Sequence, residues 1–458
     1  MSAAPRPQTP SGLILAAPAT GSGKTTVTLG LLRALRRRHG AVAAFKVGPD
    51  YIDSAFHSAA LDDPARACIN LDGWAMSDGL IGALLDIHAR DAAWVIGEGV
   101  MGLFDGAKGV HGHGDGSTAD LAARLGLPVI LVVNAKGQGA SLAALVRGFA
   151  TFRADVTIAG MILNRVASDG HAALLRDALV QSDPAIPVLG CLPDDAALAL
   201  PSRHLGLVQA IEHGTLDRFI DHAAEVVARH IDLDALTSLA TPLRIESSAG
   251  SLLPPLGQRI AVARDEAFAF AYPAMLEGWR RAGAEIAFFS PLADEAAGET
   301  ADAVFLPGGY PELHAGRIAA NRGFLSSLHQ AAARGAFVYG ECGGYMVLGE
   351  RLIDAQGVTH PMAGLLPLTT SFAERRLHLG YRQADLALPD SPFGRLGQHW
   401  RGHEFHYASV LCETPSSGGA EPLLKTTDAA GNMLGFQGLR RGSTMGSFVH
   451  LIAGTGRA

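Results

Sequence analysis

One cysteine in this sequence stands in a setting that suits a nucleophile. Cys342 lies in the run FVYGECGGYM at 337–346, where apolar residues predict a strand and two glycines permit a sharp turn into a helix. Such a turn is the cysteine counterpart of the nucleophile elbow, which exposes the reactive side chain above a sheet. The start of the following helix favours the thiolate form. A structural cysteine rarely lies beside glycines, so we predict that Cys342 is a catalytic nucleophile.

A thiol nucleophile needs a base within hydrogen-bond reach, and three histidines are candidates. His450 closes the last predicted strand, in GSFVH at 446–450, whereas His403 and His406 lie together in RGHEFHY at 401–407. These residues alone leave all three equivalent. A turn, PGGYPE at 307–312, follows another predicted strand and can offer backbone N–H groups to an oxyanion.

A second chemical motif occurs near the start of the chain, in LILAAPATGSGKTT at 13–26. It reads as a strand, a loop of small residues and a helix that begins with Gly-Lys-Thr. Backbone N–H groups of such a loop surround phosphate oxygens, the lysine adds a positive charge, and the threonine hydroxyl can bind Mg²⁺. Pro18 replaces the usual glycine, and Ala19 stands where partitioning ATPases carry a lysine. We predict nucleotide binding by Gly21, Gly23, Lys24, Thr25 and Thr26.

Carboxylates follow two predicted strands of the same region. Glu98 follows the strand at 94–96 and enters a glycine-rich run, while Asp50 and Asp53 follow the strand that ends at Lys46. The carboxyl ends of parallel strands face the ligand crevice, and Mg²⁺ prefers such hard oxygen ligands. The alternative is that Asp50 and Asp53 cap a turn beside Pro49.

Two further polar motifs have plain structural explanations. Asp105, in LFDG at 103–106, is also consistent with an ordinary Asp-Gly turn. The run HGHGD at 111–115 has two histidines but no third ligand at helical spacing, so we interpret it as a loop rather than a metal site.

The elements that position these motifs predict two α/β domains. In the first half, apolar strands near 13–17, 42–46, 94–96, 128–133, 158–163 and 188–191 alternate with helical stretches such as 25–38. Continuous apolar strands separated by helices are typical of a parallel sheet covered on both faces. The pattern breaks down at 241–258, and a second strand–helix series starts at 259–263. We expect a disordered lead-in at 1–10, a nucleotide-binding domain at 11–240, a linker at 241–258 and a second domain, which carries the thiol site, at 259–458.

Composition excludes several functional classes. Four scattered cysteines argue against a disulfide framework or a zinc site and fit a reducing cytoplasm. A net charge of −7 gives no basic surface for nucleic acid. No apolar run reaches the roughly 18 residues that span a bilayer, and the polar N-terminus is not a signal peptide. We therefore expect a cytoplasmic protein without nucleic-acid or membrane partners.

Taken together, the motifs resemble the CobB/CbiA family of cobyrinic acid and hydrogenobyrinic acid a,c-diamide synthases. The likeness covers nearly the whole chain. It is carried by the phosphate loop with Pro18 and by the segments at 46–53, 98–106, 259–270, 306–312, 341–345 and 402–407.

The resemblance implies a P-loop, dethiobiotin-synthetase-like parallel-sheet domain fused to a class I, triad-type glutaminase domain. The family's catalytic histidine falls on His450. Related glutaminases carry a glutamate two residues later, where this chain has Ile452, so the group that orients the imidazole is left open. The resemblance also assigns positions in the first domain: Mg²⁺ at Thr25, Asp50 and Glu98, substrate at Asp53 and Asp105, and adenine at Asn164.

The implied activity is a C–N ligase reaction that uses ATP, Mg²⁺ and glutamine to amidate the a and c carboxylates of cobyrinic or hydrogenobyrinic acid. It would run through an acyl phosphate and channelled ammonia. The expected partners are glutamine and a corrinoid or related tetrapyrrole polycarboxylate, and the pattern is compatible with a homodimer.

Three alternatives are weighed against this activity. Nickel-sirohydrochlorin a,c-diamide synthase is similar, whereas cobyric acid synthase usually has Gln-Asn-Met where this chain has VGPDY at 47–51. A regulatory ATPase with a glutaminase-like sensor domain is a different class, and the presence of both Cys342 and His450 argues against it.

Overall fold

The computed structural model describes residues 10–63, 65–183, 185–200, 202–203, 206–207, 210, 214–244, 251–414 and 417–454. The predicted lead-in at 1–10, apart from its last residue, and residues 245–250 of the predicted linker lie outside these ranges. The chain divides into two compact units: the first holds residues 1–106 and 111–249, and the second holds residues 107–110 and 250–458. In the described part of the chain, no helix is long and apolar enough to cross a membrane.

The first unit is built on a parallel sheet with strand order β3-β2-β4-β1-β5-β6-β7. Its strands are β1 (Ser11–Ala16), β2 (Val42–Val47), β3 (Ile69–Leu71), β4 (Trp94–Glu98), β5 (Val129–Asn134), β6 (Ile158–Val166) and β7 (Val188–Pro193). The short β10 (Thr241–Pro242) pairs antiparallel with β1. Every residue of β2 is buried, as expected for a strand covered on both faces.

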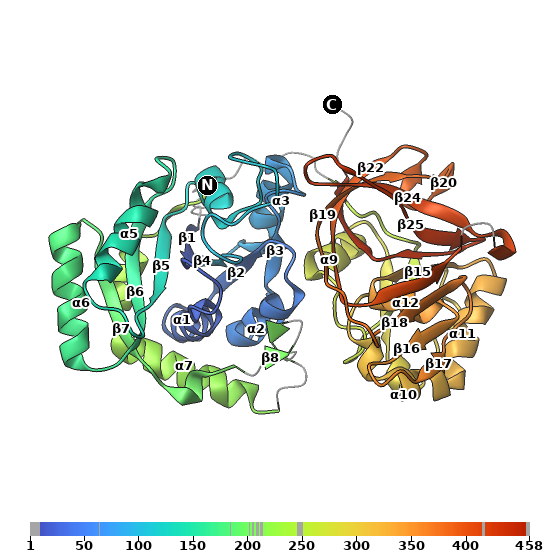
Figure 1. Cartoon of the computed structure of the whole chain (residues 1–458), viewed down its shortest axis with the longest axis horizontal. Helices are drawn as coiled ribbons and strands as arrows, with labels where there is room; N and C mark the ends of the chain where they lie inside the picture. The colour runs from blue at the N-terminus through green and yellow to red at the C-terminus, as the bar shows by residue number, and fades with distance from the viewer. Residues whose placement is uncertain are drawn as a thin grey trace, which may run out of the picture. The chain divides into compact units, whose positions relative to one another are not determined.

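Helices flank this sheet, and two of them pack closely against each other. The helices are α1 (Lys24–His39), α2 (Tyr51–Leu61), α3 (Asp78–His88), α4 (Thr118–Leu125), α5 (Ser141–Phe152), α6 (Asp169–Ser182), α7 (Leu216–His230) and α8 (Leu233–Ser238). A short 3₁₀ turn, η1 (Ala196–Leu198), and the strands β8 (Ser202–Arg203) and β9 (Gly206–Leu207) lie between β7 and α7. Helices α1 and α7 lie side by side (Figure 1). Their contact needs Gly30, where an added Cβ would lie 2.6 Å from the backbone oxygen of Ala223.

The second unit contains one large mixed sheet with strand order β11-β27-β22-β19-β24-β25-β26-β15-β14-β12-β13. Strands β13, β12, β14, β15 and β26 run parallel, and the neighbours from β26 to β11 pair antiparallel. The strands are β11 (Ser251–Leu252), β12 (Arg259–Ala263), β13 (Glu285–Phe289), β14 (Ala303–Leu306), β15 (Phe337–Glu341), β19 (His378–Leu386), β22 (His399–His406), β24 (Glu421–Asp428), β25 (Met433–Arg441), β26 (Thr444–Ser447) and β27 (Val449–Gly454).

Helices and smaller sheets complete this unit. The helices are α9 (Pro273–Arg281), α10 (Ala315–Ala320), α11 (Arg322–Ala333) and α12 (Gly343–Leu348), with 3₁₀ turns η3 (Pro291–Ala293), η4 (Pro311–Leu313) and η5 (Ser417–Gly419). A small sheet holds β16 (Arg351–Ile353), β17 (Thr359–Pro361), β18 (Leu368–Ser371) and β23 (Ser409–Glu413), and β20 (Asp390–Ser391) pairs with β21 (Gly394–Arg395). Helix α12 is buried along its whole length.

The expectation of two α/β domains, the first with a parallel sheet, is confirmed. The sequence analysis did not anticipate the antiparallel strands β19, β22, β24 and β25, because half-buried strands such as β19 lack a continuous apolar run. It also treated the stretch that ends at His450 as one strand. The structure instead breaks it at Phe448, between β26 and β27, and this break brings His450 back toward β15.

Candidate active sites

The phosphate loop joins β1 to α1 and is held in place from β6. Gly23 adopts a left-handed conformation with φ of 86° at the start of α1. Nδ2 of Asn164, on β6, donates a hydrogen bond to the backbone oxygen of Ser22 at 2.9 Å. A side chain at Gly23 would collide with that amide, so both the conformation and the space there require glycine.

Lys24 points across the loop into the glycine-rich segment after β4. Its Nζ donates to the backbone oxygen of Met101 at 2.8 Å, and the side chain is buried. Burial lowers the pKa of Lys24, although the charge of Glu98 opposes that shift. The ammonium group is therefore beside the loop, where phosphate oxygens would lie.

Thr25 meets two of the predicted carboxylates. Its hydroxyl donates to Oε1 of Glu98 at 2.9 Å, and Oδ2 of Asp53 lies 3.4 Å away. Burial and the charge of Asp50 raise the pKa of Asp53 to about 7, despite the opposing charge of Lys46. The oxygens of Thr25, Asp53 and Glu98 form a hard donor set beside the phosphate loop, which fits the ligand chemistry of Mg²⁺.

Asp50 has a different local role. Its Oδ1 accepts hydrogen bonds from the backbone N–H groups of Ile52 and Asp53 at 3.0 and 2.9 Å, so it caps helix α2. Its Oδ2 lies 3.7 Å from Nζ of Lys46. The structure thus places Asp53, rather than Asp50, next to Thr25.

Lys46, on β2, lies within the carboxylate group. Its Nζ is 3.2 Å from Oδ2 of Asp53 and 3.8 Å from Oε1 of Glu98, and it donates to the backbone oxygen of Gly99 at 3.1 Å. Burial lowers the pKa of Lys46, but the charges of Asp53, Glu98 and Asp50 raise it to a value above its usual one. A buried cation surrounded in this way stays charged.

A buried histidine binds the other oxygen of Glu98. Nε2 of His57, on α2, lies 2.6 Å from Oε2 of Glu98, and Sγ of Cys68 lies 3.7 Å from Nδ1 of the same ring. Burial alone would lower the pKa of His57, but the Glu98 carboxylate raises it to about 10. The charges of His57 and Lys46 in turn hold the pKa of Glu98 below its usual value, although burial opposes this.

The remaining predicted substrate residue, Asp105, is part of a turn. Its Oδ2 accepts a hydrogen bond from the backbone N–H of Gly102 at 2.8 Å. The geometry therefore agrees with the structural explanation for the Asp-Gly pair, and the carboxylate keeps the segment after β4 in shape.

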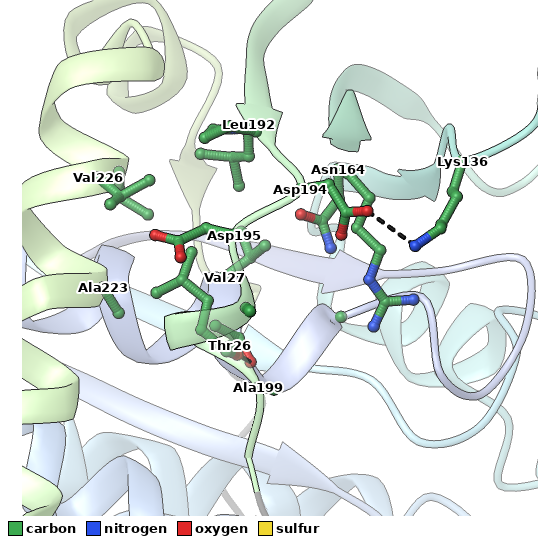
Figure 2. Close-up of a pocket in the computed structure, with 16 residues that line it drawn as sticks. Thr26, Val27, Lys136, Asn164, Leu192, Asp194, Asp195, Ala199, Ala223 and Val226 are labelled. Atoms are coloured by element: carbon green, nitrogen blue, oxygen red, sulfur yellow. Dashed lines mark hydrogen bonds and ion pairs between the residues drawn. The ribbon is translucent and has the colours of Figure 1, made fainter. Parts of the chain in front are cut away.

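A cavity of about 260 Å³ opens beside the phosphate loop (Figure 2). Its lining combines polar and apolar side chains: Gly23, Thr26, Val27, Lys136, Asn164, Arg165, Leu192, Pro193, Asp194, Asp195, Ala196, Leu198, Ala199, Ala223, Val226 and Val227. Lys136 and Asp194 form an ion pair of 2.8 Å at its edge. The cavity is continuous with Gly23 and Thr26 of the phosphate loop, so its position suits the base of a bound nucleotide.

In the second unit, Cys342 lies at the sharp turn between β15 and α12. Its backbone is strained, with φ of 50° and ψ of −105°, and its side chain is largely buried. A side chain at Gly344 would collide with the backbone oxygen of Leu306 on β14, so the turn can pack only with glycine there. This geometry is that of a nucleophile elbow at the end of a parallel strand.

His450 reaches this turn from β27. It interacts with the Cys342 thiol, and its Nδ1 lies 2.9 Å from Oε1 of Glu341. Burial lowers the pKa of His450, but Glu341 and Cys342 raise it to about 10. The two side chains also flank Gly308, where an added Cβ would lie 2.8 Å from Cε1 of His450 and 3.4 Å from Cβ of Cys342.

The other two candidate histidines are placed differently. His403 stacks on the ring of His450, with centroids 4.7 Å apart, and burial holds its pKa well below its usual value. Both ring nitrogens of His406 have partners: Nδ1 meets the backbone oxygen of Ala408 at 3.1 Å, and Nε2 meets Oε1 of Glu404 at 2.8 Å. The geometry favours His450 as the base for Cys342.

Two backbone hydrogen bonds hold the turn after β14. The backbone oxygens of Pro307 and Gly308 accept hydrogen bonds from the N–H groups of Gly344 and Phe270, at 3.1 and 2.9 Å. These bonds fix the turn after β14 against the elbow. A Cβ built on Gly343 would lie 3.1 Å from the backbone nitrogen of Gly309, so the N–H groups of these two glycines lie on adjoining turns.

Sequence reasoning did not assign roles to Lys46, His57 or Glu341. Lys46 and Glu341 lie within quoted motifs, whereas His57 lies four residues after the motif at 46–53. The available signal for Lys46 and Glu341 was their type in a predicted buried strand, since Lys and Glu are seldom fully buried without a partner.

Comparisons with known proteins agree with this division. Residues 13–208 match the family described as the CobQ/CobB/MinD/ParA nucleotide binding domain, and residues 259–458 match the CobB/CobQ-like glutamine amidotransferase domain. The chain is similar to the hydrogenobyrinate a,c-diamide synthase of Brucella anthropi, with 57% identity covering 96% of this chain and 98% of that one. The enzymes of that name from Brucella suis biovar 1 and Rhodobacter capsulatus are 56% and 53% identical. They cover 98% and 97% of this chain, and 99% of each relative is covered.

Proposed function

The chain belongs to the CobB/CobQ-like family of glutamine amidotransferases that includes the hydrogenobyrinate a,c-diamide synthases, and from this membership we propose that it is itself such a ligase. The proposed reaction converts the a and c side-chain carboxylates of hydrogenobyrinic acid, or of its cobalt form, into amides. ATP and glutamine are consumed. The observation that carries the proposal is the identity of 53–57% with enzymes of that name over nearly the full chain.

In the second unit, Cys342 attacks the side-chain amide carbon of glutamine. The amide oxygen becomes an oxyanion, to which the backbone N–H groups of Gly309 and Gly343 would donate hydrogen bonds. His450 passes a proton to the departing nitrogen, so ammonia leaves and a thioester with Cys342 remains. Water, deprotonated by His450, then cleaves the thioester and releases glutamate.

In the first unit, a substrate carboxylate oxygen attacks the γ-phosphorus of ATP, and ADP leaves. Ammonia attacks the carbonyl carbon of the resulting acyl phosphate, and phosphate leaves with the electrons of the broken C–O bond. The nitrogen gives up one proton to phosphate or water, which leaves the neutral amide. Activation is needed because a carboxylate does not react with amines at neutral pH. Lys24 binds the phosphate oxygens, and Lys46 stabilises the negative charge that carboxylate and phosphate bring together.

The carboxylates beside the phosphate loop are assigned to a magnesium site. Thr25, Asp53 and Glu98 would hold the ion, with Asp50 supporting them from the cap of α2. When bound, Mg²⁺ neutralises phosphate charge. Asn164 and the neighbouring cavity would hold the adenine of ATP.

One assay tests this function and separates it from the nickel-sirohydrochlorin a,c-diamide synthase and from the regulatory ATPase. The purified protein is incubated with ATP, Mg²⁺ and glutamine, and with hydrogenobyrinic acid, cobyrinic acid or nickel-sirohydrochlorin in parallel. Mass spectrometry should detect a diamide of hydrogenobyrinic or cobyrinic acid, with release of glutamate. The names of the relatives favour these acids over the nickel compound. Glutamate release without any amidated product would instead support the regulatory ATPase.

A further inference from the structure

The imidazole of His450 contacts Glu341, the residue that immediately precedes the nucleophile, through the ring nitrogen Nδ1. Oε1 of Glu341 lies 2.9 Å from Nδ1 of His450, and both side chains are almost completely buried. The second oxygen, Oε2, accepts a hydrogen bond from the hydroxyl of Tyr339 at 3.1 Å. Both carboxylate oxygens therefore have fixed partners, and one of them is the histidine ring.

Related glutaminases carry a glutamate two residues after the catalytic histidine, but the residue at that position here cannot orient the imidazole. Two residues after His450, at a bulge of β27, the chain has Ile452, which is buried and has no polar atom to accept an N–H. Glu341 approaches from another strand, β15, at the turn that also carries Cys342. The carboxylate thus reaches the ring from a different place in the chain.

We propose that Glu341 is the positioning residue of this glutaminase, the group that orients His450 and stabilises its protonated form. A carboxylate at Nδ1 keeps the proton on that nitrogen, which leaves Nε2 to exchange a proton with the thiol. The inference deepens the proposed function and rests on it, because it concerns the same thiol site.

The charges around His450 support this assignment. The groups that face it are Glu341 and, behind it, Tyr339 from β15, Cys342 from the elbow, and His403 from the neighbouring strand β22. His403 is held neutral by burial, and its charged form would repel that of His450. Among these groups Glu341 is the anion that contacts the ring, so it stabilises the imidazolium that forms when the thiol proton moves to Nε2.

Replacing the carboxylate by an amide of the same shape tests the proposal. In Glu341→Gln the imidazolium of His450 loses its counter-charge. We expect the kcat of glutamine hydrolysis to fall about a hundredfold or more. We also expect alkylation of Cys342 by iodoacetamide at pH 7 to slow about tenfold or more and to recover only at higher pH. Peptide mass spectrometry isolates this reaction from that of the exposed Cys412.

A matched control is Glu413→Gln. Glu413 is also a largely buried carboxylate that accepts from a tyrosine hydroxyl, here Tyr345, but its described contacts do not include His450. This variant should leave the pH profile of Cys342 alkylation where it is in the parent protein. The far-UV circular dichroism spectrum and the melting temperature report whether each variant is folded.

If the pH profile of Cys342 alkylation were the same in the parent protein and in Glu341→Gln, the inference would be overturned, even if the kcat of glutamine hydrolysis fell. If Glu341→Gln does not fold, Glu341→Asp tests the inference instead, because this variant keeps the negative charge of the carboxylate. Alkylation at pH 7 within about threefold of the parent rate would support the role of the charge, and a fall of about tenfold would refute it. Alkylation needs no glutamine or tetrapyrrole, so a parent protein that failed to make a diamide would count against the proposed function alone.

Discussion

Nε2 of His57 lies 2.6 Å from Oε2 of Glu98, in a pair that is completely buried. This contact leaves the other carboxylate oxygen, Oε1, to accept the hydroxyl hydrogen of Thr25 at 2.9 Å. The histidine is therefore placed to fix the rotamer of a carboxylate at the proposed magnesium site. Partners of this kind orient metal ligands and affect metal affinity.

The first prediction follows from that orientation. In His57→Ala, Glu98 loses its fixed partner, so the Mg²⁺ concentration needed for half-maximal amidation should rise by about ten- to a hundredfold. Both glutamine-dependent and ammonium-dependent synthesis should show this change, since both use the first unit. His57→Gln can still donate one hydrogen bond and should recover part of the loss. A variant with the Mg²⁺ dependence of the parent protein would show that Glu98 needs no such support.

The second prediction separates the two units by chemistry. Cys342→Ala and Cys342→Ser remove the nucleophile, so amidation with glutamine should fall to background while amidation from a high concentration of ammonium salt persists. The product is measured by mass spectrometry with each nitrogen source in turn. Cys191→Ala, at a half-buried cysteine of the first unit, serves as the control and should retain both reactions. Loss of both reactions in the Cys342 variants would contradict the division of labour.

Both of these sites contain parts that a reader of the sequence could predict and parts that require the fold. The phosphate loop and the elbow are short contiguous runs in which glycine, lysine or cysteine types specify the chemistry directly. The contacts of His57 with Glu98 and of His450 with Glu341 join residues separated by 41 and 109 positions. No local pattern encodes contacts between residues so far apart in the sequence. They depend on the packing of α2 against β2, the strand beside β4, and on the break at Phe448.

The carboxylates after β2 show a second limit on what the sequence can predict, namely which of two nearby acidic residues faces the site. Asp50 and Asp53 are three residues apart on a chain that turns into a helix, and either could face a metal on sequence grounds. The backbone N–H groups at the start of α2 attract Asp50 as a cap, which directs Asp53 toward Thr25. Helix capping therefore decides between two residues that spacing alone leaves equivalent.

The third prediction concerns the phosphate loop. Lys24→Met removes the ammonium group that lies beside the loop while keeping most of the side-chain volume. Amidation should fall about a hundredfold or more with either glutamine or ammonium, because activation of the carboxylate precedes the use of ammonia. Hydrolysis of glutamine measured without ATP should be retained. Survival of full amidation in this variant would refute the assignment of the loop.

The last prediction uses the pKa of His450. The folded state raises this pKa from about 6.5 to about 10, so it binds the proton more tightly than the unfolded state. The resulting stabilisation is fully present below about pH 6.5 and is lost as pH rises through about 10. The difference in melting temperature between the parent protein and His450→Gln should therefore shrink across this window.

The control for that measurement is His378→Gln, in the same unit. Burial and the charge of His406 lower the pKa of His378, so above about pH 7.5 the ring is neutral in both the folded and the unfolded state. Its difference from the parent protein should stay constant between about pH 7.5 and 10. In a Glu341→Gln background, the pH dependence assigned to His450 should largely disappear, because the carboxylate that raises its pKa is gone. A difference for His450→Gln that grows with pH would mean that the ring is neutral in the folded protein, and the ion pair with Glu341 would then have to be abandoned.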